Sequence, residues 1–265
     1  MSITLIKKEL KSNYKILFLF LAILTLYGSV IVAMYDPKLG ESLNMMAESM
    51  PELFAAFGMM NASATLLDFV MNYYYGFIAI VVPLVFIILM TSRLLTHYMD
   101  RGSMAYLLAT PHNRRSILLS QCFVMFLFKV IIVVYITCLI LLCGYIMFNE
   151  IIDISQFLMI NVGLLGLLSL MSSLCILSAV VFEDTRLALG GGAGLNLFFL
   201  LIQMLSQVSD QIEFLKYLTP LTLFDVQSIA SFDTGSLLSV ILLFVMSMMM
   251  IIASCIIFKK RDISV

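Results

Sequence analysis

Charged residues are scarce in this chain of 265 residues. They make up 12% of the sequence, against about 25% in soluble domains. Hydrophobic residues make up 62%, and the mean hydropathy is +1.10. A water-soluble fold cannot bury this much apolar surface, so the composition indicates an integral membrane protein. The net charge of −1 gives no sign of binding to nucleic acid, and we expect no such partner.

The sequence also lacks the motifs that several chemistries need. It has no G-x-x-x-x-G-K-[ST] phosphate loop, no G-x-S-x-G nucleophile turn and no H-E-x-x-H zinc motif. Its two histidines, His97 and His112, have no cysteine near them at metal-binding spacing. The five cysteines lie in apolar stretches without a C-x-x-C, which favours small buried side chains over disulfides. We therefore expect no catalytic residue, no metal and no cofactor in this chain.

Six apolar runs are each long enough to cross a bilayer as a helix, which takes about 20 residues. Backbone in lipid must satisfy its own hydrogen bonds, and these runs are apolar all round, so we expect helices and not a membrane barrel. Because the sequence has no internal repeat and no low-complexity linker, residues 1–265 are predicted to form a single transmembrane domain. The predicted spans cover residues 16–35, 73–92, 117–148, 157–182, 187–208 and 236–258.

The positive charges fall unevenly on the two sides that these spans define. If the N-terminus is inside, twelve of the fifteen Lys and Arg residues are inside, and only Lys38 and Lys216 are outside. The acidic residues run the other way, with eleven of the sixteen outside. By the positive-inside rule, both termini and the segment 93–116 between the second and third spans are expected in the cytosol.

Three stretches beside the spans are amphipathic or unusually apolar. Residues 1–15 suit a helix lying on the inner leaflet, or carry ordinary flanking charge. Residues 41–60 suit a lid or interfacial helix, or a packed loop, and Pro51 is expected to break or kink them. Residues 209–235 are too apolar for a solvated loop and too short to cross twice. They predict a pair of short re-entrant or surface-lying helices.

Lys129 is the only charge well inside a predicted span. Charges within membranes are functional hypotheses by default. The third span, however, covers about 48 Å at 1.5 Å per residue, more than the roughly 30 Å of the hydrocarbon core. If the excess lies on the cytosolic side, Lys129 snorkels to the interface. The alternative is that Lys129 contacts a substrate or a partner.

The other polar features of the spans are few. The run GGGAG at 190–194 follows no strand and carries no lysine, so it does not predict a phosphate loop. Gly190 and Gly194 have the G-x-x-x-G spacing that lets helices pack closely, with a flexible hinge as the alternative. Buried acids of the kind used by ion-driven carriers are absent from the spans, so energy for any transport must come from elsewhere. The spans are poor in polar residues, and those that stand out are Asn161, Asn196, Gln203 and the Tyr73–Tyr75 cluster.

The segment MDRGSMAYLLATPHNRR, residues 99–115, stands out as charged and punctuated between two apolar spans. Residues 103–110 predict a short helix that follows Gly102 and ends at Pro111. Met104, Leu107 and Leu108 share its apolar side. A short apolar helix with charged ends suits insertion into a groove on a soluble partner. The alternative is an ordinary inner loop with positive-inside charge.

The sequence DRGSMAYLLATPHNRRSI resembles the cytosolic loop of ABC-2-type permeases of ABC transporters. The family pattern is an acidic residue, Gly-Thr, Leu-Leu, a small residue, x-Pro and a basic residue. It is matched here by Gly102, Ser103, Leu107, Leu108, Pro111 and Arg114 or Arg115, with Ser103 for Thr and Asp100 for Glu. The stretches LIKKELK, YLTPLTLFD and FKKRDIS resemble the family's interfacial helix, the segment before its last span and its C-terminal tail, so the resemblance covers the whole chain.

This resemblance implies an all-α integral membrane fold with six transmembrane helices, of the ABC-2, type V exporter-like kind. It implies an N-terminal interfacial helix, a cytosolic coupling helix and short re-entrant helices before the last span. Residues 93–116 would dock in a groove of a separate ATPase, which binds the ATP and Mg²⁺. The docking face would be Met104, Leu107 and Leu108, with charged contacts from Asp100, Arg101, Arg114 and Arg115.

The resemblance also implies partners and a cargo. A second permease, identical or related, would complete the transporter in the plasma membrane of a bacterium, in contact with membrane lipid. The length and layout are similar to those of exporters of amphipathic cytolytic peptides such as phenol-soluble modulins. The alternatives are an ABC-linked sensor or immunity subunit, and an exporter of another cargo such as a drug, a lipid or an ion.

Overall fold

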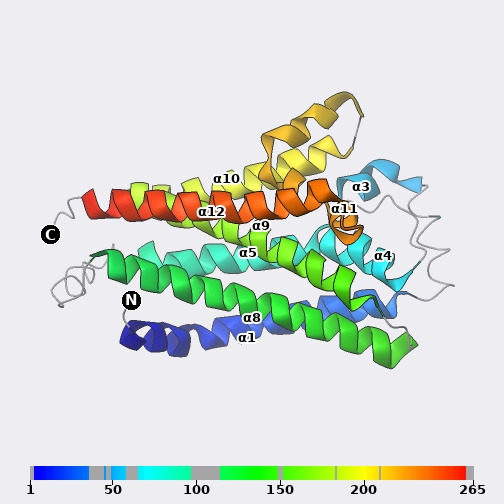
Figure 1. Ribbon diagram of the computed structural model, residues 1–265, viewed down its shortest axis with the longest axis horizontal. Coiled ribbons are helices and arrows are strands. Elements are labelled where there is room, and N and C mark those ends of the chain that lie inside the picture. Colours follow the sequence, from blue (N-terminus) through cyan, green and yellow to red (C-terminus); the bar gives the residue numbers. More distant parts are fainter. Residues whose placement is uncertain are drawn as a thin grey trace.

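The computed structural model describes residues 3–35, 45, 49–57, 65–96, 114–148, 152–182, 184–208 and 210–260. The side chains of residues 114, 210–213 and 260 are not among those described. Within these ranges the regular elements are all helical (Figure 1). Six of them form the long bundle: α1 (Ile3–Ala33), α5 (Ile78–Thr91), α8 (Arg114–Phe148), α9 (Ile154–Val181), α10 (Thr185–Ser206) and α12 (Thr234–Lys260).

Shorter helices complete the bundle. The second span is built from α4 (Leu66–Val70), the π-helical turn η1 (Met71–Tyr75), α5 and the π-helical turn η2 (Ser92–Thr96). The other short helices are α3 (Pro51–Ala56), the 3₁₀ helices η3 (Asp210–Leu218) and η4 (Pro220–Leu223), and α11 (Val226–Ala230). Pro51 interrupts this stretch as predicted: Ser49 is helical, Met50 is a bend, and Pro51 begins the new helix α3, because the first position of a helix needs no N–H partner.

Six helical segments are long and apolar enough to cross a membrane, which confirms the predicted number and order. The largest difference is at the first span, predicted to begin at residue 16. Residues 3–33 form one continuous helix, because no proline interrupts the amphipathic start. The second span begins seven residues earlier than predicted, at Leu66, where Thr65 and Asp68 form a capping box. The six segments are Ile3–Ala33, Leu66–Thr96, Arg115–Phe148, Ile154–Val181, Thr185–Ser206 and Thr234–Lys259.

The first turns of α1 direct a partly polar stripe toward the protein. Leu5, Glu9, Asn13 and Leu17 are buried at four-residue spacing, and Asn13 donates a hydrogen bond to the Glu9 carbonyl oxygen at 2.9 Å. The exposed side chains include Ile3, which is 70% exposed, and all four lysines of the segment. Ile3 and Tyr14 are therefore available to lipid, whereas Ile6 and Leu10 are half-buried against the core.

Helix α9 is the centre of the bundle. In its most apolar stretch 78% of the residues are buried, whereas the corresponding share is 22% in α10 and in α12. The helix packs against α5, α8, α10, α11 and α12. Two glycines allow this close approach. A Cβ on Gly163 would lie 3.0 Å from Ile229, and one on Gly166 would lie 3.2 Å from Phe244. The short helix α11 and the last span α12 therefore press directly against α9.

The elements divide between the two ends of the bundle (Figure 1). The beginnings of α1 and α8 and the end of α12 lie together at one end, which we call the terminal end. Helices α3, α4 and α11 lie at the other, the α11 end. The predicted short helices before the last span are confirmed as η3, η4 and α11, and η3 and η4 pack on α10.

Candidate functional site

The predicted docking segment lies mostly outside the described residues. Asp100, Arg101, Gly102, Ser103, Met104, Leu107, Leu108 and Pro111 all fall between residues 97 and 113. Its flanks are described. The turn η2 ends the second span, α8 begins at Arg114, and Arg115 is exposed in the first turn of α8. The docking role of these residues stays a prediction.

Lys129 is buried between α8 and α9. Its side chain is 3% exposed, and its Nζ atom donates hydrogen bonds to Ser172 Oγ at 2.6 Å and Ser169 Oγ at 3.2 Å. The ammonium group also lies 5.7 Å from the centre of the Phe126 ring. Lys129 is about 22 Å along α8 from Arg114 and about 28 Å from Phe148, at 1.5 Å per residue.

This position corrects one expectation for Lys129. Snorkelling is wrong, because the amine is buried against α9 and does not extend to an interface. Lys129 lies near the middle of α8 and not near its cytosolic start. Lys129 lines neither of the two cavities described below, so it is a contact between two helices of this chain.

Within the chain, Gly190 and Gly194 of α10 do not make the close helix contact that their spacing predicts. Gly190 and Gly194 have no other side chain or element of this chain within 4 Å of an added Cβ. The close contact with α9 is made by their neighbours. A Cβ on Gly192 would lie 2.8 Å from Cys175 Cα, and one on Gly191 would lie 2.7 Å from Ser178 Oγ. Within the chain, Gly191 and Gly192 therefore make the close contact with α9. Gly190 and Gly194, the two glycines of the G-x-x-x-G spacing, lie on the face of α10 that points away from the rest of the chain.

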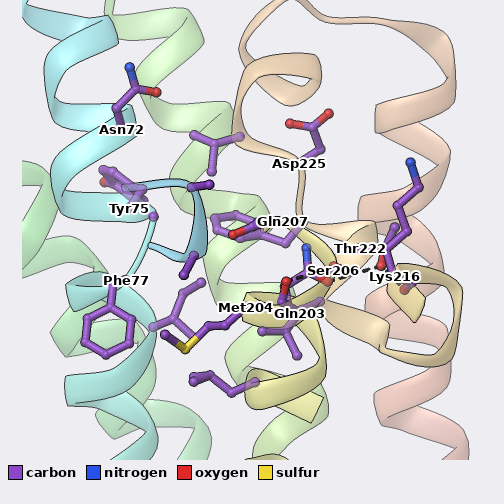
Figure 2. Close-up of a pocket in the computed structure, with 18 of the residues that line it drawn as sticks. Asn72, Tyr75, Phe77, Gln203, Met204, Ser206, Gln207, Lys216, Thr222 and Asp225 are labelled. Carbon is purple, nitrogen blue, oxygen red and sulfur yellow. Dashed lines mark hydrogen bonds between the residues drawn. The ribbon is translucent and has the colours of Figure 1, made fainter. Parts of the chain in front are cut away.

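A cavity of about 600 Å³ lies at the α11 end of the bundle (Figure 2). Its lining comes from α3, the second span around η1, the end of α10, η3, η4 and α11. Asn72, Tyr75 and Phe77 come from the second span, and Gln203 and Gln207 come from α10. We call this space the outer cavity, because the charge distribution predicts that the α11 end faces outside.

The outer cavity combines carboxamides with aliphatic side chains. Its amide residues are Asn72, Gln203, Gln207 and Gln227. Its aliphatic lining includes Ile80, Leu200, Met204, Leu221 and Val226. Lys216 and Asp225 also line it and carry opposite formal charges. Such a lining of apolar surface with a few polar groups is typical of small-ligand sites.

Hydrogen bonds hold the amides of α10 in place. The hydroxyls of Thr219 and Thr222 are within hydrogen-bonding distance of Gln203 Oε1, at 3.5 and 3.4 Å. These contacts join α10 to η4. The Thr222 hydroxyl also lies against the Lys216 carbonyl oxygen. With its amide turned to face α3, Gln207 donates to the carbonyl oxygens of Ala55 and Ala56 at 3.2 and 3.3 Å.

The wall formed by the second span is rigidly positioned. Tyr75 is fully buried, and its hydroxyl donates to Asn161 Oδ1 at 2.8 Å. A Cβ on Gly76 would lie only 2.6 Å from the Phe57 carbonyl oxygen, so glycine alone permits this approach of the chain after α3. The Phe57 and Phe77 rings then meet edge to face, with 4.9 Å between centroids. π-Helical turns such as η1 are frequent at functional sites.

A second, apolar cavity of about 390 Å³ lies on the other side of η4. It is lined by Leu170 and Leu174 of α9, Phe199 of α10, and Met246 and Met250 of α12. Thr222 lines both cavities. Among the described residues, no group of three His, Cys, Asp or Glu side chains is placed to hold a metal ion.

Comparison with known families decides the class of protein. The family described as ABC-2 family transporter protein matches residues 3–263. The chain belongs to this family. The family resemblance predicted from the segment 99–115 is therefore confirmed, and the chain is a multi-pass membrane component of the ABC-2 transporter type. No curated protein and no solved structure matches it.

The sequence analysis did not predict the outer cavity. Of its lining, the sequence singled out only Gln203 and the tyrosine cluster as polar features of the spans. The residues of α3, η4 and α11 were missed, because their segments are far apart in the chain. A usable signal was present in residues 209–235, whose amides and threonines interrupt an otherwise apolar stretch.

Proposed function

We propose that this ABC-2 permease is the membrane subunit of an ATP-driven exporter, coupled to a separate ATPase through residues 93–116. The exported cargo is an amphipathic or hydrophobic molecule, and a peptide fits best. The second permease of the transporter is another copy of this chain or a related chain. The observation that carries the proposal is the family match over residues 3–263, since ABC-2 permeases normally work with an ABC ATPase.

Two features of the chain support this proposal. The acidic residues of the six span helices, Glu9 and Asp68, lie near the helix starts and not at their middles, where ion-driven carriers need them, so an external energy source is needed. The second and third spans flank the segment 97–113 at the terminal end, where the first turns of α1 expose four lysines. By the positive-inside rule this end faces the cytosol, where ATP is available.

The proposal is tested by purifying the tagged chain from its native host in mild detergent and identifying co-purifying proteins by mass spectrometry. We expect an ATPase with a phosphate-binding loop in roughly equal amount. Leu107→Glu places a charge on the predicted docking face, and it should remove the ATPase. The matched control is Leu53→Glu, on a side chain of α3 that is 52% exposed, which should keep it.

Retention of the ATPase by Leu107→Glu and by a deletion of residues 99–115 would contradict the coupling role. Reconstitution then separates an exporter from a sensor or immunity subunit. Vesicles that hold the complex should move a fluorescent amphipathic peptide across the membrane only when ATP is present. ATP hydrolysis without any movement of peptide would favour the sensor alternative.

A further inference from the structure

We propose that the outer cavity is a binding site for an uncharged segment of an amphipathic peptide, recognised by the amides of Gln203 and Gln227. The inference deepens the proposed function, because such a segment would belong to the exported cargo. The argument uses the charge of the lining, its unused hydrogen-bonding groups and its apolar surface.

The charge of the lining selects against ionic ligands. Lys216 and Asp225 carry the only formal charges among the described lining residues, and these two charges are opposite. The Asp225 carboxylate is already engaged at the start of α11, where Oδ1 accepts from the Gln227 backbone N–H at 3.2 Å and Oδ2 accepts from Ser228 Oγ at 2.5 Å. A cationic ligand in this partly apolar space would lose hydration and meet a carboxylate that already accepts two hydrogen bonds.

The unused hydrogen-bonding groups fit peptide bonds. Gln203 accepts through its oxygen, and no described residue accepts from its amide nitrogen. The Gln227 side chain has no hydrogen-bond partner in the described part of the chain. A carboxamide offers both a donor and an acceptor, as the backbone of a bound peptide does. These two residues come from α10 and α11, so they can pair with different peptide units of one segment.

The apolar lining favours a peptide over a sugar. The carboxamides are set among Ile80, Leu200, Met204 and Leu221, which would contact aliphatic side chains and desolvate the hydroxyls of a sugar without replacing their hydrogen bonds. The volume of about 600 Å³ is in the range of small-ligand sites and suits a short segment. The wall at Tyr75 and Gly76 is already fixed, so little ordering is needed on binding.

The chain has no tryptophan, so a single reporter can be placed in the cavity. Phe77→Trp puts one indole on the lining, and the purified protein in detergent is titrated with a capped peptide of five alternating leucine and asparagine residues. We expect a saturable change in indole emission. Gln227→Leu should weaken binding about three- to tenfold, because one or two hydrogen bonds to the peptide are lost. Gln203→Leu should weaken binding to a similar extent. Gln156→Leu, on α9 away from the lining, should have no effect.

The outcomes separate this inference from the proposed function. Equal affinity in Gln227→Leu, Gln203→Leu and Gln156→Leu would overturn it, as would the absence of saturable binding. Displacement of the peptide by maltotriose would also overturn it in favour of a sugar site. The titration uses neither ATP nor the ATPase, so saturable, amide-dependent binding supports the site even if no ATPase co-purifies. Conversely, an ATPase that co-purifies with a chain that does not bind the peptide refutes this inference alone.

Discussion

Lys129 carries an amine in the middle of the long helix α8, and its described hydrogen-bond partners are hydroxyls and not a carboxylate. Its Nζ atom donates to Ser172 Oγ, and Ser172 Oγ in turn donates to the Ser169 carbonyl oxygen at 2.9 Å. The Ser172 hydroxyl therefore accepts from the amine and donates to the α9 backbone. Removing the amine leaves Ser172 satisfied, whereas removing the hydroxyl leaves a buried amine short of an acceptor.

This asymmetry gives a prediction for stability. Ser172→Ala should lower the free energy of unfolding by about 1–3 kcal/mol, because the buried amine keeps only the longer bond to Ser169. Lys129→Met keeps the length of the side chain without the charge and should change it by less. Ser173→Ala is the control, since its hydroxyl is also buried in α9 but donates to the Leu170 carbonyl oxygen. Thermal unfolding in detergent measures all three, and a larger loss in Lys129→Met than in Ser172→Ala would contradict the argument.

The sequence identified Lys129 as an intramembrane charge but did not give its depth. A run of 32 apolar residues is longer than the bilayer core needs, and nothing in the run says at which end the excess lies. Packing settles this, because Ser169 and Ser172 of α9 lie opposite the middle of α8. Similarly, Asn161 was visible as a polar residue in a span, but its partner Tyr75 is 86 positions away.

At the scale of elements, the spacing of the glycines did not predict how α10 is rotated about its axis, that is, which of its faces packs on α9. The G-x-x-x-G pair was recognised, yet Gly192 faces α9 and Gly194 faces away. Asn196 confirms this rotation, because its amide nitrogen donates to the Gly192 carbonyl oxygen at 2.8 Å and to the Met171 carbonyl oxygen of α9 at 3.2 Å. Five consecutive small residues, 190–194, allow several rotations of the helix, and the buried amide of Asn196 selects one.

The two faces of α10 predict opposite effects of alanine. Gly192→Ala should destabilise the chain by about 1–3 kcal/mol, because its Cβ would press on Cys175 Cα, a backbone atom that cannot move easily. Gly194→Ala meets nothing within the chain and should stabilise the helix by about 0.5–1 kcal/mol. The check is the unfolding temperature of each purified variant. A drop for Gly194→Ala as large as that for Gly192→Ala would mean that another molecule packs on this face.

For the whole molecule, run length and apolarity were sufficient to predict six spans, because backbone in lipid has few alternatives to helix. The outer cavity could not be predicted in the same way. Its lining joins residues 55–56, 71–80, 200–207 and 216–227, and only the folded chain brings them together. The second span connects this cavity to the segment 97–113, since Tyr75 lies at one end of it and Thr96 at the other. A movement of the predicted docking segment would reach the cavity along this span, which a turn at Gly76 and Phe77 interrupts.

The orientation of the whole bundle is the last expectation to test, and α12 provides the simplest measurement. Thr234 and Lys259 are both exposed and stand at its opposite ends, about 38 Å apart at 1.5 Å per residue, which exceeds the roughly 30 Å hydrocarbon core. In a variant without the five native cysteines, Thr234→Cys should react with a membrane-impermeant maleimide in intact cells. Lys259→Cys should react only after the cells are permeabilised, because the positive charges place the end of α12 in the cytosol. The reverse pattern would place residues 97–113 outside the cell, where no ATPase could use cytosolic ATP, and would refute the coupling role even if the family assignment stands.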